Sequence, residues 1–119
     1  MYRIPDELDL SCVIGEFTTQ IHVGKYDLQF SLGKVHFSIW SPILLFDSEK
    51  EVGMWQEGKW PDPAFIELFN VSVTECVIRD NRHIILRFEN GFEMHLADAS
   101  DEYESMSISI EGESGPWII

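Results

Sequence analysis

The chain has few of the features that mark membrane proteins, secreted disulfide proteins or nucleic-acid-binding proteins. Among its 119 residues are two cysteines and only eight lysines and arginines, against 21 aspartates and glutamates. It contains no run of about 18 apolar residues that could cross a membrane as a helix. Residues 1–7 lack the basic and apolar regions of a secretory leader. We therefore expect a cytoplasmic protein that does not enter a membrane.

Metal-binding spacing is also missing. Cys12 and Cys76 each lie in an apolar context, so buried free thiols are expected rather than a disulfide. The histidines and cysteines show neither the Cys-x-x-Cys nor the His-x-x-x-His spacing that structural zinc sites usually have. The histidines are His22, His36, His83 and His95. We expect no metal and no other cofactor.

The common catalytic signatures are absent as well. There is no Gly-x-Ser-x-Gly, no phosphate-binding glycine loop and no dinucleotide fingerprint. A pair of carboxylates carries no information in a chain with 21 acidic residues. A thiol nucleophile would need a positioned base, for which His22 is the only suggestion. The sequence predicts a binding protein and not an enzyme.

What the chain does have is acidic charge. Its formal net charge is −13, and no lysine or arginine follows Arg87. Such a surface repels nucleic acids and anionic membranes, so neither is an expected partner. It attracts basic proteins and accelerates their association. An acidic surface that serves solubility alone is the alternative.

Alternating apolar residues predict a mainly β (α+β) fold with short helices. The expected helices are residues 6–14, after Pro5, and residues 64–69, after Asp62 and Pro63. The expected strands are residues 17–23, 26–31, 35–39, 43–46, 71–78, 84–88, 92–96, 103–110 and 117–119. A chain of this length forms a single domain, residues 1–119.

Two segments of the chain read alike. Residues 28–39 and 86–96 each show an alternating strand, a turn with glycine and a second alternating strand, with Leu28, Phe30 and Gly33 matching Leu86, Phe88 and Gly91. The offset between matched residues is 58 up to Gly33 and Gly91, and it is 57 from Val35 and Phe92 onward. A second turn that is one residue shorter than the first would produce this change. We expect pseudo-repeated helix–strand–hairpin units, 5–46 and 62–110, in a sheet sandwich or one curved sheet. Chance likeness between alternating hairpins is the alternative.

Two tryptophans stand out in the acidic segment 47–62, which breaks the alternating pattern; a hairpin over part of it is the alternative. Trp55 and Trp60 are large aromatics flanked by charge, which is typical of the anchors at protein interfaces. A lid over an open end of the sheet is the alternative. Trp40 and Trp117 continue the alternation of strands, so we expect them in the core. The sequence predicts that Trp55 and Trp60 bind a partner.

Four acidic residues lie in one connection after the last hairpin. They are Asp98, Asp101, Glu102 and Glu104. Because they are close in sequence, we expect them to form one patch that contacts a basic partner. An ordinary solvated loop is the alternative.

Short motifs resemble a family of small acidic, β-rich bacterial proteins of unknown function. They are Tyr-x-Leu-x-Phe at 26–30, Leu-x-Phe-x-x-Gly at 86–91, Tyr-Glu-Ser at 103–105 and an apolar end at 117–119. The chain is also similar in size, charge and strand content to immunity proteins of bacterial toxin systems, including contact-dependent growth inhibition. This resemblance implies a protein that neutralises a cognate toxin, often a nuclease, by direct binding. No toxin-binding motif carries over residue by residue.

The expected function is therefore that of an immunity protein whose acidic surface covers the basic site of a toxin domain. Two other functions stay open. A β-rich module could enclose a small apolar ligand, which requires an open cavity between the strand units. A stand-alone protein could instead associate with its own copies, and the sequence does not fix its oligomeric state.

Overall fold

The computed structural model describes residues 3–100 and 103–119, and nearly all of its regular secondary structure is β-strand. The strands are β1 (Ile21–Val23), β2 (Leu28–Leu32), β3 (Val35–Ile39), β4 (Ile43–Asp47), β5 (Lys50–Trp55), β6 (Val73–Asp80), β7 (His83–Phe88), β8 (Phe92–Ala97), β9 (Met106–Ile110) and β10 (Trp117–Ile118). There are also two 3-10 helices among the described residues: η1 (Ser11–Val13) precedes β1, and η2 (Pro63–Leu68) lies between β5 and β6. The prediction of a mainly β protein is confirmed.

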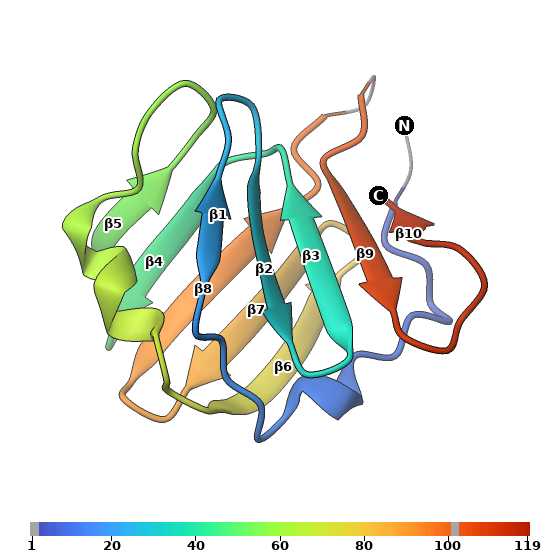
Figure 1. The fold of residues 1–119 in the computed structure, drawn as a ribbon, viewed down its shortest axis with the longest axis horizontal. Helices are drawn as coiled ribbons and strands as arrows, with labels where there is room; N and C mark the ends of the chain where they lie inside the picture. Colours follow the sequence, from blue (N-terminus) through green and yellow to red (C-terminus); the bar gives the residue numbers. More distant parts are fainter. Residues whose placement is uncertain (1–2, 101–102) are drawn as a thin grey trace.

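The strands form two antiparallel sheets that lie face to face (Figure 1). Sheet 1 has the order β1-β2-β3-β9-β10, and sheet 2 has the order β5-β4-β8-β7-β6. Of the two predicted arrangements, the structure has the two-layered one and not a single curved sheet. Among the described residues, no helix has the length and apolar character to cross a membrane.

Each sheet combines strands from both halves of the chain. Strands β1 to β3 form a meander in sheet 1, after which the chain crosses and adds β4 and β5 to sheet 2. Strands β6 to β8 form a meander in sheet 2, after which the chain crosses back and adds β9 and β10 to sheet 1. Because β3 pairs with β9 and β4 pairs with β8, the two crossing connections lie at the same end of the sandwich. This end is the upper one in Figure 1.

The two predicted hairpins exist, but their turns differ from the prediction. In the β2–β3 hairpin, Leu32 pairs with Val35 across a two-residue turn with Gly33 at φ +59°. In the β7–β8 hairpin, three residues separate the strands. Gly91 there has φ +93° and donates its N–H to the backbone oxygen of Phe88 at 3.0 Å. Glycine is suited to both turns because it adopts positive φ without strain. The second turn is longer and not shorter.

The predicted residue equivalence between the hairpins is therefore wrong. Leu28 pairs with Ile39, whereas its predicted equivalent Leu86 pairs with Met94 and not with Leu96. The halves share an order of elements without this register. A duplication of helix–strand–hairpin units stays a prediction.

The two predicted short helices appear only as 3-10 turns: η1 lies within residues 6–14, and η2 covers most of residues 64–69. In η2, Pro63 stands at the start, and the carboxylate of Asp62 does not cap the helix. Asp62 Oδ2 instead accepts the backbone N–H of Met54 at 2.9 Å, and Oδ1 lies 3.2 Å from Lys59 Nζ. These bonds lower the pKa of the Asp62 carboxyl, the backbone donor first. Without a cap, six residues favour the tighter helix that short segments commonly use.

The apolar faces of the sheets meet in one continuous core. Its side chains include Phe30 and Phe37, whose rings stack with centroids 4.8 Å apart. Trp55 also lies in this core and is fully buried. Since these side chains fill the space between the sheets, the core does not favour the enclosed ligand cavity considered above.

The two thiols are free, as expected, but only one is even partly buried. Cys12 is exposed in η1, whereas Cys76 is half-buried on β6. Burial, followed by the nearby Cys12 and Asp9, raises the pKa of Cys76 to about 11. The prediction of a buried Cys12 is wrong, because η1 directs the neighbouring Val13 into the core and leaves Cys12 exposed.

Candidate functional site

A surface groove lies at the end of the sandwich where the two crossing connections meet. Its volume is about 660 Å³. Three segments line it: the β3–β4 connection, the residues after β5 and the β8–β9 connection. The lining residues are Trp40, Ser41, Pro42, Gln56, Glu57, Ala99, Ser100, Tyr103, Glu104 and Ser105.

Hydrogen bonds between the crossing connections hold the floor of the groove. The backbone N–H groups of Trp40 and Ser41 both donate to the oxygen of Ser105, at 2.9 and 3.2 Å. The hydroxyl of Ser41 donates to the oxygen of Ala97 at 2.7 Å. Ser41 and Ser105 are buried. The two connections therefore form one unit, although they are far apart in sequence.

Asp98 fixes the start of the β8–β9 connection from inside the protein. Its side chain is fully buried, and Oδ2 lies 3.1 Å from Nη1 of Arg3. Oδ1 accepts the hydroxyl of Ser105 at 3.3 Å, and Ser105 Oγ accepts the backbone N–H of Ala99 at 3.0 Å. Asp98 therefore presents no carboxylate oxygen to a partner, because its charge is used within the fold. Asp98 is therefore not part of a surface patch, contrary to the prediction.

The open part of the groove combines aromatic rings with carboxylates. Trp40 is 37% exposed and Tyr103 is 69% exposed. Glu57 and Glu104 are both exposed, and the described residues that line the groove include no lysine, arginine or histidine. Aromatic faces and carboxylates both attract ammonium and guanidinium groups. This chemistry suits the binding of a cation.

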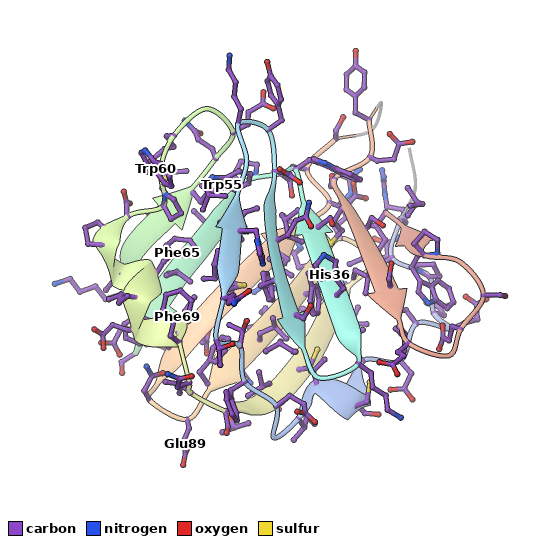
Figure 2. The ribbon with its side chains drawn as sticks, viewed as in Figure 1. His36, Trp55, Trp60, Phe65, Phe69 and Glu89 are labelled. Carbon is purple, nitrogen blue, oxygen red and sulfur yellow. The ribbon has the colours of Figure 1, made fainter. Side chains whose placement is uncertain are left out.

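The two predicted tryptophan anchors, both labelled in Figure 2, differ greatly in their exposure to solvent. Trp55 is buried in the core, so it offers a partner no surface in this structure. Its indole N–H has no hydrogen-bond partner among the described residues. The inward phase of β5, which pairs Trp55 with Ile43, explains this position. Segment 47–62 was predicted to be irregular, with a hairpin over part of it as the alternative, and the structure has the regular strand β5 paired antiparallel with β4 there.

Trp60 is 77% exposed, but it does not line the groove. It borders a separate hollow of about 230 Å³ that includes Lys25 and Lys59. Gly58 in the same loop donates its backbone N–H to the oxygen of Lys25 at 2.7 Å. Trp60 therefore lies near basic groups, and its role as a partner contact stays a prediction.

Of the four residues in the predicted acidic patch, the structure places only one in the groove. Glu104 lies in the groove, whereas Asp101 and Glu102 fall outside the described residues. Sequence reasoning missed Trp40, Glu57 and Tyr103, and it assigned Trp40 to the core. Trp40 directly follows β3 and precedes Pro42, which could have indicated that the strand ends there and that the ring lies at the rim.

A second polar cluster crosses the outer face of sheet 1. Ser31 Oγ lies 2.7 Å from His36 Nδ1, and His36 Nε2 lies 3.0 Å from Gln29 Oε1. Gln29 Nε2 donates to Asp27 Oδ2 at 2.6 Å. Ser31 and His36 are direct partners in the β2–β3 register. Such cross-strand bonds stabilise antiparallel sheets, and this role accounts for the cluster.

Among the described residues, no group of three or more histidine, cysteine or acidic side chains is placed to hold a metal ion. No family model, curated protein or solved structure matches the chain. The resemblance to immunity proteins therefore stays a prediction, and the site must be interpreted from its own geometry.

Proposed function

We propose that the protein binds and neutralises a basic partner protein in the cytoplasm, as an immunity protein neutralises a bacterial toxin domain. One observation carries this proposal: the groove places two aromatic rings and two glutamates together on a chain of net charge −13. Concave surfaces with aromatic anchors and polar rims are typical of binding sites.

The acidic side chains would occupy positions that the partner normally offers to phosphate groups. A nuclease site binds its substrate through lysines and arginines, and carboxylates can contact the same cations. Glu57 and Glu104 supply these carboxylates, while Trp40 and Tyr103 supply apolar area and ring faces for the cationic side chains. Occupation of the basic site would exclude the nucleic acid.

The construction of the groove supports tight binding. The bonds from Trp40 and Ser41 to Ser105 hold the two connections together before a partner arrives. Asp98 and Arg3 hold the same region from below. A preorganised site loses less conformational entropy on binding than a flexible one, which leaves more of the contact energy as affinity.

The proposal requires a basic toxin domain as the partner, and a charge reversal tests the binding of such a domain. Glu57→Lys with Glu104→Lys should slow association with that domain about tenfold or more and leave the melting temperature nearly unchanged. The matched control is Glu89→Lys with Glu111→Lys, two exposed residues in other turns that give the same change of charge. Stopped-flow association at several salt concentrations measures the effect. Equal slowing in both variants would show that net charge acts without the groove.

A further inference from the structure

The loop between β5 and η2 separates the groove from a second hollow. Residues 56–57 of this loop line the groove, and residues 58–60 line the hollow, which has a volume of about 230 Å³. Residues 23–25, at the turn between β1 and β2, line the hollow as well. Both segments lie at the end of the sandwich that carries the groove (Figure 1). Because two residues of chain span at most about 7 Å, a partner in the groove also lies beside the hollow.

Hydrogen bonds hold the walls of the hollow in place. The backbone N–H of Asp62 donates to the oxygen of Met54 at 3.2 Å, and the Asp62 carboxylate accepts the N–H of Met54 at 2.9 Å, which closes the loop. The N–H of Gly58 donates to the oxygen of Lys25 at 2.7 Å and fastens the loop to the β1–β2 turn. The hollow therefore exists before a partner arrives, and little conformational entropy is lost when it is filled.

Trp60 presents a large apolar side chain at the edge of the hollow. Among the large apolar residues that the structure describes, it is the most exposed, at 77%. Figure 2 shows it on the β5–η2 loop. Tryptophan is enriched among the residues that contribute most to protein interfaces. The hollow is smaller than the roughly 300–1,000 Å³ of small-molecule sites, so it suits one side chain of a protein partner.

The hollow and the groove carry opposite charges. The described residues that line the hollow include Lys25 and Lys59 but no carboxylate. Lys25 Nζ lies 5.6 Å from the centre of the Tyr26 ring, and no described carboxylate forms an ion pair with it. Lys59 Nζ lies 3.2 Å from Asp62 Oδ1. An ammonium group has three donors, so both lysines can donate to a further carboxylate.

We infer that the partner of the groove fills this hollow with an acidic side chain. The inference rests on the proposed function, because it concerns the same partner. The groove binds the partner's cations, and the adjoining lysines bind a carboxylate beside those cations, with Trp60 covering the contact. A partner with cations alone would meet repulsion from Lys25 and Lys59 at this point. The two signs of charge fix the orientation of the partner and disfavour basic surfaces that lack the acidic group.

Two peptides with blocked ends test the inference on the complete chain. They are Arg-Arg-Arg-Arg-Gly-Gly-Asp-Asp and Arg-Arg-Arg-Arg-Gly-Gly-Asn-Asn, which differ in charge but hardly in shape. A chain of net charge −13 should attract the asparagine peptide more strongly if net charge alone acted. We expect the reverse, with the aspartate peptide binding about three- to fivefold more tightly, as an exposed ion pair allows.

The tryptophan indole signals of the labelled protein report the affinity and the place of binding. Both peptides should shift the signal of Trp40 in the groove. The aspartate peptide should in addition shift the signal of Trp60, because its carboxylates draw the peptide into the hollow.

Two pairs of substitutions locate the contact. Lys25→Gln with Lys59→Gln should remove the preference for the aspartate peptide. Lys25→Gln alone leaves the ion pair between Lys59 and Asp62 intact, and it serves as the second variant if the double variant does not fold. The matched control is Lys34→Gln with Lys50→Gln, two exposed lysines at the other end of the sandwich that give the same change of charge. The control should retain the preference.

The possible failures are distinguishable. If both peptides shift Trp40 and the asparagine peptide binds equally or more tightly, the inference is wrong and the proposed function stands. If neither peptide shifts Trp40, the proposed function fails and the inference fails with it. A preference for aspartate that the Lys25 and Lys59 variants retain would also overturn the inference, because the acidic group would then bind elsewhere.

Discussion

The groove and the outer face of sheet 2 are both open to solvent, but they are built in different ways. The groove consists of chain connections and presents aromatic rings with carboxylates. The sheet face consists of regular strands and presents aliphatic side chains beside charges that neutralise each other. The comparison shows that one acidic domain presents both a surface that combines aromatic rings with unpaired carboxylates and a surface whose charges pair with each other.

The largest effect should separate the two faces of sheet 2. Leu45→Ala removes a fully buried side chain from the core and should lower the free energy of unfolding by about 2–5 kcal/mol. Leu44→Ala, at the neighbouring position on the outer face, should cost about 1 kcal/mol or less. Urea denaturation of both variants measures the difference. Equal losses would mean that the outer face is as closely packed as the core.

The next effect concerns the support of the groove. Asp98→Ala removes the buried ion pair with Arg3 and the bond from Ser105, and should lower the free energy of unfolding by about 2–3 kcal/mol. Amide signals of the β8–β9 connection should broaden or shift, while those of β4 and β7 should not. Glu104→Gln, in the same connection, is the control and should change stability by no more than about 0.5 kcal/mol. A uniform change across the protein would contradict this local role.

The smallest effect is a pH dependence on the sheet face. Bonds with His95 and Arg87 lower the pKa of Glu93 in the folded protein. The stabilisation that follows is present above the pKa of the unfolded chain, and it is lost as the pH falls through the lower folded pKa. From about pH 5 to about pH 3, Glu93→Gln should therefore lose less stability than the original protein. Denaturation curves across this range measure it, and parallel losses would contradict the assignment.

Much of the fold could be predicted because strands leave a local signal. Alternating residues such as Leu28, Phe30 and Leu32 face the core, and they indicated their strands correctly. The crossing of each hairpin to the opposite sheet left no such signal, since it depends on contacts between distant segments. The register of β7 with β8 was missed because a longer turn displaced every pair beyond it.

The site was harder to predict than the fold. Its residues come from three connections that meet only through the crossings, so closeness in sequence was a poor guide. Asp98 and Glu104 illustrate this, because they lie in one connection but one is buried and the other is exposed. Trp40 and Trp55 were assigned to the wrong environments for a related reason. Whether a side chain near the end of a strand is buried depends on the residue at which the strand ends: Trp40 follows the end of β3 and is exposed, whereas Trp55 is the last residue of β5 and is buried.

The most direct test of the central claim is a titration of the labelled protein with a hexa-arginine peptide, followed through the four tryptophan indole signals. The indole of Trp40 should shift at physiological salt, while that of the buried Trp55 should not. The shift should disappear in Glu57→Lys with Glu104→Lys and persist in Glu89→Lys with Glu111→Lys. An unmoved Trp40 signal, or equal shifts in both variants, would contradict the proposal that this groove binds cationic side chains.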